Sequence, residues 1–385
     1  MGGDRRYRTA GRPCGCRGAL KVWTGRRDLG DLQGRKDAIT SELDGLANPE
    51  RFTEALDLRN EAPTPLLQSL SKMIEIRIAE EAIGDLVLSG EAKCPCHLAI
   101  GQEAVAVGVS RSLRATDRIF GNHRSHAQYL AVDGSLSKLM AEILGRDTGA
   151  SRGMGGSMHL FAGDRGFLGS VPIVAGTVPL AVGAALAAKM DGKGDIGVAY
   201  FGDGACEEGV VHESLNLAAC YGLPVLFVCE NNLFSSHMDI ALRQPSDRMA
   251  RFAEAHKVAA EVVDGNDVMA VAHAAGRLVA RARNGEGPGF LEAVTYRWRG
   301  HVGPREDVDV GLRRSVEDLA AWKRRDPIRR LADALVERGD LTKAQMKTME
   351  AGIRVLVDAA VAEARQGTWP AASALLEHVY AKKVT

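Results

Sequence analysis

The stretch IGVAYFGDGACEEGVVHESLNLAACYGLPVLFVCENN, residues 196–232, has the pattern of a strand, a tight turn, a helix and a second strand. Residues 196–201 form a short apolar run that ends at Gly202-Asp203-Gly204, where glycines permit a sharp turn. A segment with helical spacing follows, and residues 224–229 form a second apolar run. The strands of such a unit are parallel and its crossover is right-handed. We therefore expect Asp203 and the Asn231-Asn232 pair at one edge of a sheet, where open α/β sheets bind ligands.

The polar residues at this edge offer oxygen ligands of the kind that Mg²⁺ prefers. Asp203 supplies a carboxylate and Asn232 supplies a carboxamide oxygen, and the remaining positions around such an ion are commonly filled by phosphates and water. The helix that begins near Glu207 also directs free N–H groups toward an anion. The pattern predicts a magnesium–diphosphate site. A lone Gly-Asp-Gly would instead favour an ordinary crossover turn with a capping asparagine.

Gly-Asp-Gly followed by Asn-Asn about thirty residues later resembles the thiamine diphosphate motif. The resemblance implies that Asp203, Asn232 and the main-chain carbonyl of Phe234 bind Mg²⁺. It also implies that Gly204 and Ala205 contact the cofactor. The predicted cofactors are therefore thiamine diphosphate and Mg²⁺.

Residues 96–104, CHLAIGQEA, resemble the CHLxxGQEA stretch of the alpha subunit of 2-oxo acid dehydrogenases, the thiamine-dependent decarboxylating component. The resemblance extends over nearly all of residues 60–380. It implies an α/β thiamine diphosphate-binding fold, with a mostly parallel sheet, helices on both faces and a helical C-terminal tail. It makes His97 and His301 the expected catalytic residues. Without it, a core histidine is the simpler interpretation of His97, because a single histidine carries no spacing information.

Residues 121–131, GNHRSHAQYLA, resemble the family's diphosphate-binding stretch, normally Tyr-Arg-x-His-Gly. The resemblance places His123 and Arg124 at the cofactor, with Arg124 as a bidentate phosphate donor. His123 stands where tyrosine is usual, and Ala127 stands where glycine is usual. On its own, Arg124 would be read as a solvated surface arginine.

Two further stretches carry expected cofactor contacts. Residues 172–187 parallel a segment whose backbone contacts the aminopyrimidine ring, so Pro172 and Val174 are the expected contacts. Pro172 replaces a usual glycine and has no N–H, so it must use its carbonyl or its ring. Residues 296–301 match the pattern Tyr-Arg-x-x-Gly-His, which places Arg297 and His301 at the cofactor.

Composition limits the partners and the compartment. Lysine plus arginine equals aspartate plus glutamate, 49 of each in 385 residues, so no whole-chain field favours nucleic acid or anionic membranes, and we expect neither as a partner. The longest uncharged run, residues 171–188, is better explained by a buried helix that starts near Pro179 than by a membrane span. The seven cysteines are scattered without zinc-site spacing, and Cys94 and Cys96 are too close to form one, so a cytoplasmic location fits best.

The chain divides by composition into an extension and one domain. The first 27 residues hold seven arginines and one acid, which predicts a disordered basic extension over residues 1–45. A transit peptide is the alternative, but serine is absent before Ser41. Residues 46–385 are predicted to form a single domain, since no low-complexity linker or internal repeat interrupts residues 60–380.

The resemblance implies oxidative decarboxylation of a small 2-oxo acid, with pyruvate as the first candidate, and acyl transfer to a lipoyl group of a partner acyltransferase. The glutamate that activates the cofactor is expected on a separate beta subunit, in an assembly of two alpha and two beta chains, because 385 residues leave no room for a fused beta domain. An acetoin dehydrogenase alpha subunit and a catalytically inactive scaffold subunit of the same fold are the alternatives. No residue separates pyruvate, branched-chain 2-oxo acids and acetoin.

Overall fold

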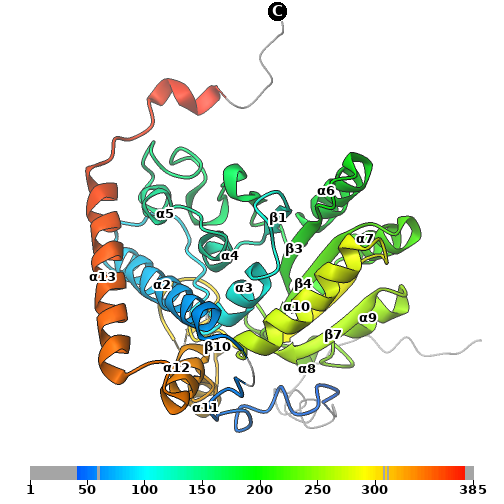
Figure 1. Cartoon of the computed structure of the whole chain (residues 1–385). Coiled ribbons are helices and arrows are strands. Elements are labelled where there is room, and N and C mark those ends of the chain that lie inside the picture. Colours follow the sequence, from blue (N-terminus) through cyan, green and yellow to red (C-terminus); the bar gives the residue numbers. More distant parts are fainter. Residues whose placement is uncertain (1–40, 59–60, 307, 310–311, 378–385) are drawn as a thin grey trace, which may run out of the picture.

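A six-stranded sheet runs through the centre of the molecule (Figure 1). In the computed structural model, which describes residues 41–58, 61–306, 308–309 and 312–377, the strand order is β2-β1-β3-β4-β8-β7. Every neighbouring pair in this sheet is parallel, so the predicted mostly parallel sheet is confirmed. The strands are β1 (Arg118–Gly121), β2 (Phe167–Ser170), β3 (Gly197–Gly202), β4 (Val225–Asn231), β7 (Ala259–Asp264) and β8 (Gly289–Val294). Two small antiparallel pairs lie outside it: β5 (Phe234–Ser235) with β6 (Met238–Asp239), and β9 (Val308–Asp309) with β10 (Leu312–Arg313).

Successive residues of the central strands face opposite sides of the sheet, and both sides are buried. In β4, Leu226 and Val228 pack into the core on one side, while Phe227 and Cys229 pack into the core on the other. Residues 225–229 are therefore all apolar, and this part of the strand is a continuous apolar run rather than an alternating one. This double burial is why the apolar runs on either side of Asp203 predicted strands correctly.

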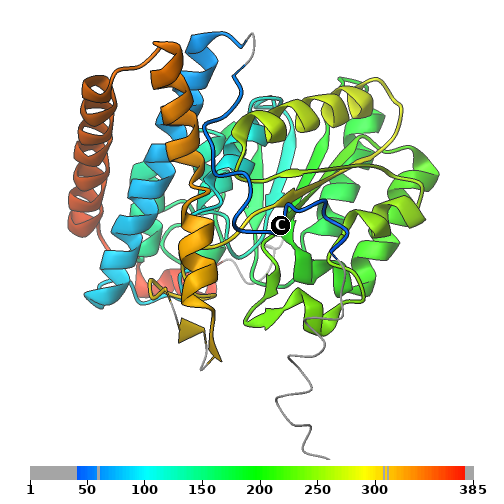
Figure 2. The ribbon, with the colours of Figure 1, turned by 90° about the horizontal axis from the view of Figure 1, so that it is seen from below.

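Helices cover both faces (Figures 1 and 2). The helix α13 lies beside α2, on the side of the molecule away from α6 and α7. The first face carries α2 (Pro63–Leu88), α3 (Glu103–Ser110), α4 (His126–Ala131), α5 (Leu136–Ile143), α10 (Val268–Arg283), α12 (Pro327–Arg338) and α13 (Lys343–Gln366). The second face carries α6 (Val178–Asp191), α7 (Gly209–Tyr221), α9 (Ala250–Ala255) and residues of α11 (Val316–Lys323). The short α8 (Ile240–Arg243) follows β6.

Local signals set the ends of the C-terminal helices. The side chain of Asp326 accepts a hydrogen bond from the N–H of Ile328, and Pro327 occupies the first turn of α12. Gly339 ends α12 in the left-handed region, at φ 87°. A capping box between Thr342 and Gln345 begins α13. The helical C-terminal tail that the resemblance implied is thus confirmed.

The second part of the uncharged run, from Val178 onward, lies in α6, with Pro179 in its first turn as expected. The helix is only half buried, however: Leu180 is 53% exposed and Met190 is 80% exposed. The expectation of a buried helix is therefore correct for one side of α6 only. Within the described part of the chain, no helix combines the length and the apolar character needed to cross a membrane.

The first described residues pack against the domain. The hydroxyl of Ser41 donates to Asp247, and Leu43 is buried in the core of the second sheet face. Residues 41–45 therefore do not share the disorder that we expected for residues 1–45, because Leu43 supplies apolar surface that this core buries. The rest of the expected extension lies outside the described residues. A single domain over residues 46–385 stays a prediction.

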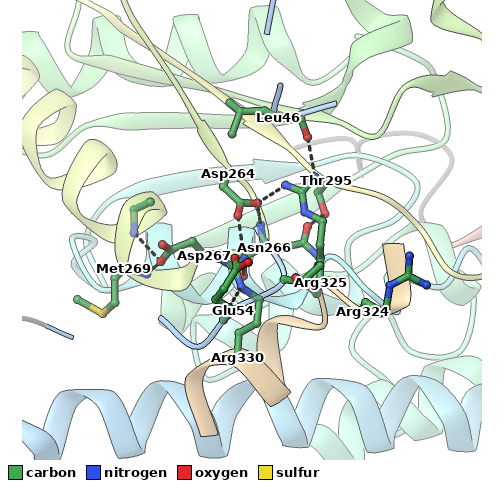
Figure 3. A network of polar contacts seen from close by, with 12 residues as sticks. Leu46, Glu54, Asp264, Asn266, Asp267, Met269, Thr295, Arg324, Arg325 and Arg330 are labelled. Carbon is green, nitrogen blue, oxygen red and sulfur yellow. Dashed lines mark hydrogen bonds and ion pairs between the residues drawn. The ribbon is translucent and has the colours of Figure 1, made fainter. Parts of the chain in front are cut away.

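A buried polar network ties the helical tail to the sheet (Figure 3). Asp264, the last residue of β7, accepts hydrogen bonds from Arg325 and Arg330, each at 2.8 Å. The amide nitrogen of Asn266 donates to the carbonyl of Arg325 at 2.9 Å, and its amide oxygen accepts from Thr295 at 2.8 Å. Arg325 and Arg330 are both buried, so one carboxylate neutralises two guanidinium groups away from water.

Replacing Asp264 tests how strongly this network stabilises the fold. The Asp264→Asn substitution leaves two buried guanidinium groups without a counter-charge, and we expect a loss of about 3–5 kcal/mol in the free energy of unfolding. Urea unfolding of both proteins measures the difference. The control is Arg277→Ala, which removes an exposed ion pair with Glu261, a residue of β7 like Asp264. This variant should change the free energy of unfolding by at most about 1 kcal/mol. Equal losses in the two variants would contradict the assigned role of Asp264.

Candidate active site

A cavity of about 410 Å³ lies at the carboxyl edge of the sheet, where β3 and β4 end. Its wall is completed by the segment before α3, the segment before α4 and the loop at residue 301. The structure brings into this one cavity nearly all the residues that the sequence placed at a cofactor, namely His97, His123, Arg124, Pro172, Val174, Asp203, Gly204, Ala205, Asn232, Phe234 and His301. What these residues bind stays a prediction.

Asp203 and Asn232 lie next to each other, as the parallel strands predicted. Asp203 starts the short 3-10 helix η3 (Asp203–Glu207) directly after β3, and Asn232 directly follows β4. The N–H of Asn232 donates to the Asp203 carboxylate at 3.3 Å, and the N–H of Phe234 donates to the Asn232 side-chain oxygen at 3.3 Å. A carboxylate, an amide oxygen and a main-chain carbonyl on neighbouring turns form a donor set that fits Mg²⁺.

The turn after Asp203 leaves no room for a side chain at Gly204. A Cβ atom at this position would collide with the hydroxyl of Ser235, which lies in β5. The close approach of these two segments holds the Asp203 turn against the loop that contains Phe234. Glycine is therefore required here because of packing, in addition to the sharp turn that the sequence indicated.

Asp203 carries a positive partner that was not expected from the sequence. Arg243 of α8 forms ion pairs with the buried Asp203 carboxylate and with Glu207. Burial raises the pKa of Asp203, and the Arg243 guanidinium opposes that rise. Arg243 pairs with Oδ2 of Asp203 and the N–H of Asn232 donates to Oδ1, so a Mg²⁺ ion would compete with Arg243 for this carboxylate. Arg243 belongs to no motif and lies 40 residues after Asp203, so only the folded chain reveals the pair.

Three histidine rings meet edge to face on the cavity wall. The ring centres of His97, His123 and His301 lie 4.7, 4.9 and 5.2 Å apart. Burial and the charge of Arg124 lower the pKa of His97 to about 2 and that of His123 to about 3, so both rings are neutral at pH 7. The Nδ1 atom of His97 is buried and has no hydrogen-bond partner among the described residues. An unpartnered ring nitrogen on a residue that lines the cavity fits a polar ligand such as a phosphate.

Of the two arginines that were predicted to contact the cofactor, one lines the cavity and the other does not. Arg124 is buried, which excludes a solvated surface arginine; it donates to the carbonyl of Leu98 at 2.8 Å and to that of His301 at 3.2 Å. Arg297 is also buried but is not part of the cavity lining. It donates to the main-chain carbonyls of Ser236 and Arg299. Arg297 therefore supports the loop after Phe234, and its direct contact with a cofactor stays a prediction.

Behind the cavity, a buried chain of hydrogen bonds holds α4. The Nδ1 atom of His126 lies 2.9 Å from the Glu80 carboxylate, and its Nε2 atom lies 2.8 Å from the Ser157 hydroxyl. Burial opposes protonation of this ring, but the Glu80 carboxylate raises the pKa of His126. The histidine of the Tyr-Arg-x-His-Gly pattern thus orients the segment that carries Arg124 and does not line the cavity. Glu80 and Ser157 were not expected, because no local pattern connects them to His126.

Glu230 is a cavity residue that the sequence analysis did not identify, because the predicted apolar run ended one residue before it. It lies in β4, is buried, and accepts a hydrogen bond from Gln128 at 2.8 Å. Burial raises the pKa of Glu230 to about 7. The glutamate of the Cys-Glu-Asn-Asn run was the available sequence signal, since a charged side chain near the end of a buried strand needs a polar partner.

The titration of Glu230 should appear in the stability of the apo chain. The ordinary pKa of a glutamate is 4.5, whereas that of Glu230 in the folded chain is about 7, so between these two pH values the folded state keeps a proton that the unfolded state has lost. The protonated carboxyl therefore contributes its full stability below about pH 4.5, and this contribution is lost as the pH rises to about 7. Glutamine does not titrate, so the Glu230→Gln variant does not lose this contribution. The free energy of unfolding of the variant minus that of wild type should therefore be about 2.5 kcal/mol larger at about pH 8 than at about pH 5. Urea unfolding at the two pH values measures the gain.

The control for this experiment is Glu254→Gln. The Arg248 guanidinium lowers the pKa of Glu254, so this group is ionised at both pH values in either state. Its stability relative to wild type should stay constant over the interval. A constant difference for Glu230→Gln as well would show that the Glu230 carboxyl is ionised in the folded chain throughout.

Comparisons with known proteins agree with this geometry. The family described as Dehydrogenase E1 component matches residues 71–373. The alpha subunit of acetoin:2,6-dichlorophenolindophenol oxidoreductase from Bacillus subtilis (strain 168) is 37% identical over 327 residues, which cover 85% of this chain and 96% of that protein. The pyruvate dehydrogenase E1 component subunit alpha of Rhizobium meliloti (strain 1021) is 36% identical over 292 residues, 76% of this chain and 83% of that protein. The chain therefore belongs to the dehydrogenase E1 component family.

Proposed function

We propose that this chain is the alpha subunit of a thiamine diphosphate-dependent 2-oxo acid dehydrogenase. Its substrate is a small 2-oxo acid, with pyruvate first, and the acyl group passes to a lipoyl group of a partner acyltransferase. The observation that carries the proposal is the cavity itself, which is lined both by the oxygen ligands of Asp203 and Asn232 and by Arg124 and the three histidines. The first set, the metal wall, suits a divalent cation, and the second set, the anion wall, suits an anion; together they fit a metal-bound diphosphate.

Each wall has a distinct role in this proposal. Asp203, Asn232 and the carbonyl of Phe234 hold Mg²⁺, while Arg124 and the N–H groups of Gly204 and Ala205 hold the diphosphate. When bound, thiamine diphosphate supplies a nucleophilic carbon and an electron sink for the loss of CO₂. Pro172 and Val174 at the rim are the expected contacts of its aminopyrimidine ring.

His97 and His301 are the proposed catalytic residues, with His123 beside them at the cofactor. Because its ring is neutral, His97 can donate one N–H to a phosphate or carboxylate oxygen without the cost of a buried positive charge. His123, in the position of the usual tyrosine, keeps a donor there, since a neutral imidazole also carries one N–H. This replacement supports an active subunit over an inactive scaffold.

A beta subunit is the proposed second half of the site, in an assembly of two alpha and two beta chains. Ten of the nineteen large apolar side chains that are exposed in the described residues fall between Met154 and Tyr221. This segment includes α6, α7 and the cavity rim at Val174, which is 48% exposed. Apolar surface concentrated beside a site indicates a partner protein that covers it. The partner would supply the activating glutamate; the alternative is Glu230, the one glutamate in the lining of this cavity.

Acetoin is the second candidate substrate. Two of the relatives carry the name of an acetoin-dependent oxidoreductase, the Bacillus subtilis protein above and one from Cupriavidus necator that is 36% identical over 341 residues. We keep the cytoplasm as the proposed location on the ground of the scattered cysteines; some relatives bear chloroplastic or mitochondrial names.

Reconstitution with a beta subunit tests whether this chain holds only one half of the active site. We expect the chain, co-expressed with the beta subunit encoded nearest to it, to oxidise one of pyruvate, branched-chain 2-oxo acids or acetoin with an artificial electron acceptor, and only when Mg²⁺ and thiamine diphosphate are present. Each chain alone should be inactive. Activity of this chain alone that is lost in Glu230→Gln would instead make Glu230 the activating glutamate, and a stable complex without cofactor binding would support the scaffold alternative.

The metal ligands are tested by Asp203→Ala in the reconstituted complex. Loss of the only carboxylate in the proposed ligand set should abolish Mg²⁺-dependent retention of thiamine diphosphate during gel filtration. The matched control is Asp191→Ala, which removes a surface carboxylate that pairs with Arg118 and should leave retention unchanged. Unchanged retention in Asp203→Ala would remove Asp203 from the metal site.

A further inference from the structure

Two cysteines lie at the rim of the cavity and have no role in the proposed reaction. Cys94 and Cys96 flank Pro95, which lines the cavity, and Cys96 directly precedes His97. Their Sγ atoms are 3.8 Å apart. This distance allows a thiol to share its hydrogen with a neighbouring thiolate, and it is short enough for a bond to form after a small movement.

The two thiols are in unlike surroundings. Cys94 is half-buried, and the hydrogen bond from Cys96, with a further one from the Ser157 backbone, lowers the pKa of Cys94 to about 6. The hydrogen bond with Cys94, together with burial, raises the pKa of Cys96. Cys94 is therefore the thiol of the pair that ionises more readily, with a protonated thiol beside it, which is the arrangement of a reactive cysteine with its resolving partner.

The other described cysteines lack this combination. Cys206 and Cys229 also approach each other, with 3.9 Å between their Sγ atoms, but both are fully buried, and burial raises the pKa of Cys229. Cys220 is exposed, and its sulfur contacts the side chain of Asn216 rather than another cysteine. Access, a thiolate and a second sulfur thus occur together at Cys94 and Cys96 among the described residues.

The pair is connected to the histidines of the cavity through the main chain. The carbonyl of Cys96 accepts a hydrogen bond from the N–H of Gly303 at 2.8 Å, and Gly303 is two residues after His301. A disulfide requires the two sulfur atoms to close from 3.8 Å to about 2.05 Å. Because Cys96 is adjacent to His97, this closure moves the backbone that positions His97 and strains the contact that positions the His301 loop.

We propose that Cys94 and Cys96 form a peroxide-sensitive thiol pair whose oxidation to a disulfide weakens anion binding in the adjacent cavity. The Cys94 thiolate attacks one oxygen of hydrogen peroxide, the O–O bond breaks, and the leaving hydroxide takes a proton from solvent to form water. The Cys96 sulfur then attacks the sulfenic sulfur of Cys94, the S–O bond breaks, and a second water leaves with the Cys96 proton. The two thiols lose two electrons, peroxide gains two, and a dithiol reductant reverses the change.

Peptide mapping of the full-length chain tests the chemistry. Trypsin releases residues 94–111 as one peptide that contains both cysteines and no other. After treatment with dilute hydrogen peroxide and then alkylation, we expect this peptide to be two hydrogens lighter and unalkylated, and dithiothreitol should restore both thiols. Cys96→Ser should stop at a sulfenic acid that dimedone labels, and Cys220→Ser should behave as wild type. Full alkylation of both thiols in peroxide-treated wild-type protein, under conditions that oxidise Cys220, would overturn the proposal.

Calorimetry with Mg²⁺ and inorganic pyrophosphate tests the effect on the cavity, which rests on the proposed function. Oxidised wild-type chain should bind pyrophosphate about tenfold more weakly than reduced chain, as expected when a charged ligand loses one good hydrogen bond. Peroxide-treated Cys94→Ser should keep the affinity of reduced protein. An unchanged affinity after complete disulfide formation would refute the coupling. If neither form binds pyrophosphate, the proposed cofactor site fails instead, and the coupling to it fails with it, while the peptide map still decides the thiol chemistry.

Discussion

Burial of both faces of the parallel sheet is the constraint on which the rest of the structure depends. Within β3, β4 and β8 it leaves no place for charge except near their carboxyl ends, and four buried carboxylates lie at or near the carboxyl ends of the strands. Each has its own partners: Arg243 for Asp203, Gln128 for Glu230, two arginines for Asp264, and Asn231 with two main-chain N–H groups for Glu292. Burial raises the pKa of Glu230 to about 7, and the charge of Arg124 and the hydrogen bond from Gln128 oppose that rise only in part.

The same constraint decides how much of the fold was predictable. Apolar runs identified the strands on either side of Asp203, because this signal is local, and the family resemblance correctly implied a helical C-terminal tail. The packing of Leu43 was missed, since a leucine in a basic, poorly patterned segment shows its burial only through the core that receives it. The exposed side of α6 was missed because a half-exposed helix made of apolar residues has the same composition as a buried one.

The residues of the candidate site also fall into those that the sequence predicted and those that only the fold reveals. Motif residues such as Asp203 and Arg124 were placed in one cavity correctly, because a resemblance carries both residue and position. Arg243, Glu80 and Ser157 act through side chains that meet over 31 to 46 residues of sequence, and no periodicity reports such contacts. Arg297 shows the opposite limit: the motif marked it, but the fold uses its guanidinium to hold main-chain carbonyls of the neighbouring loop.

The walls of the cavity also differ in what holds them. Asp203 and Asn232 extend directly from strands that are hydrogen-bonded along their length, so this part of the cavity belongs to the sheet. The part that holds His97, His123 and His301 consists of loops, which are joined by the side chain of Arg124 and by main-chain bonds such as those from Gly303 to Cys96 and from Trp298 to Ile100. We therefore expect a change of one ångström or two to be absorbed by the histidine loops rather than by the sheet. A thiol pair placed at Cys94 and Cys96 acts on the part of the site that can move without unfolding the sheet.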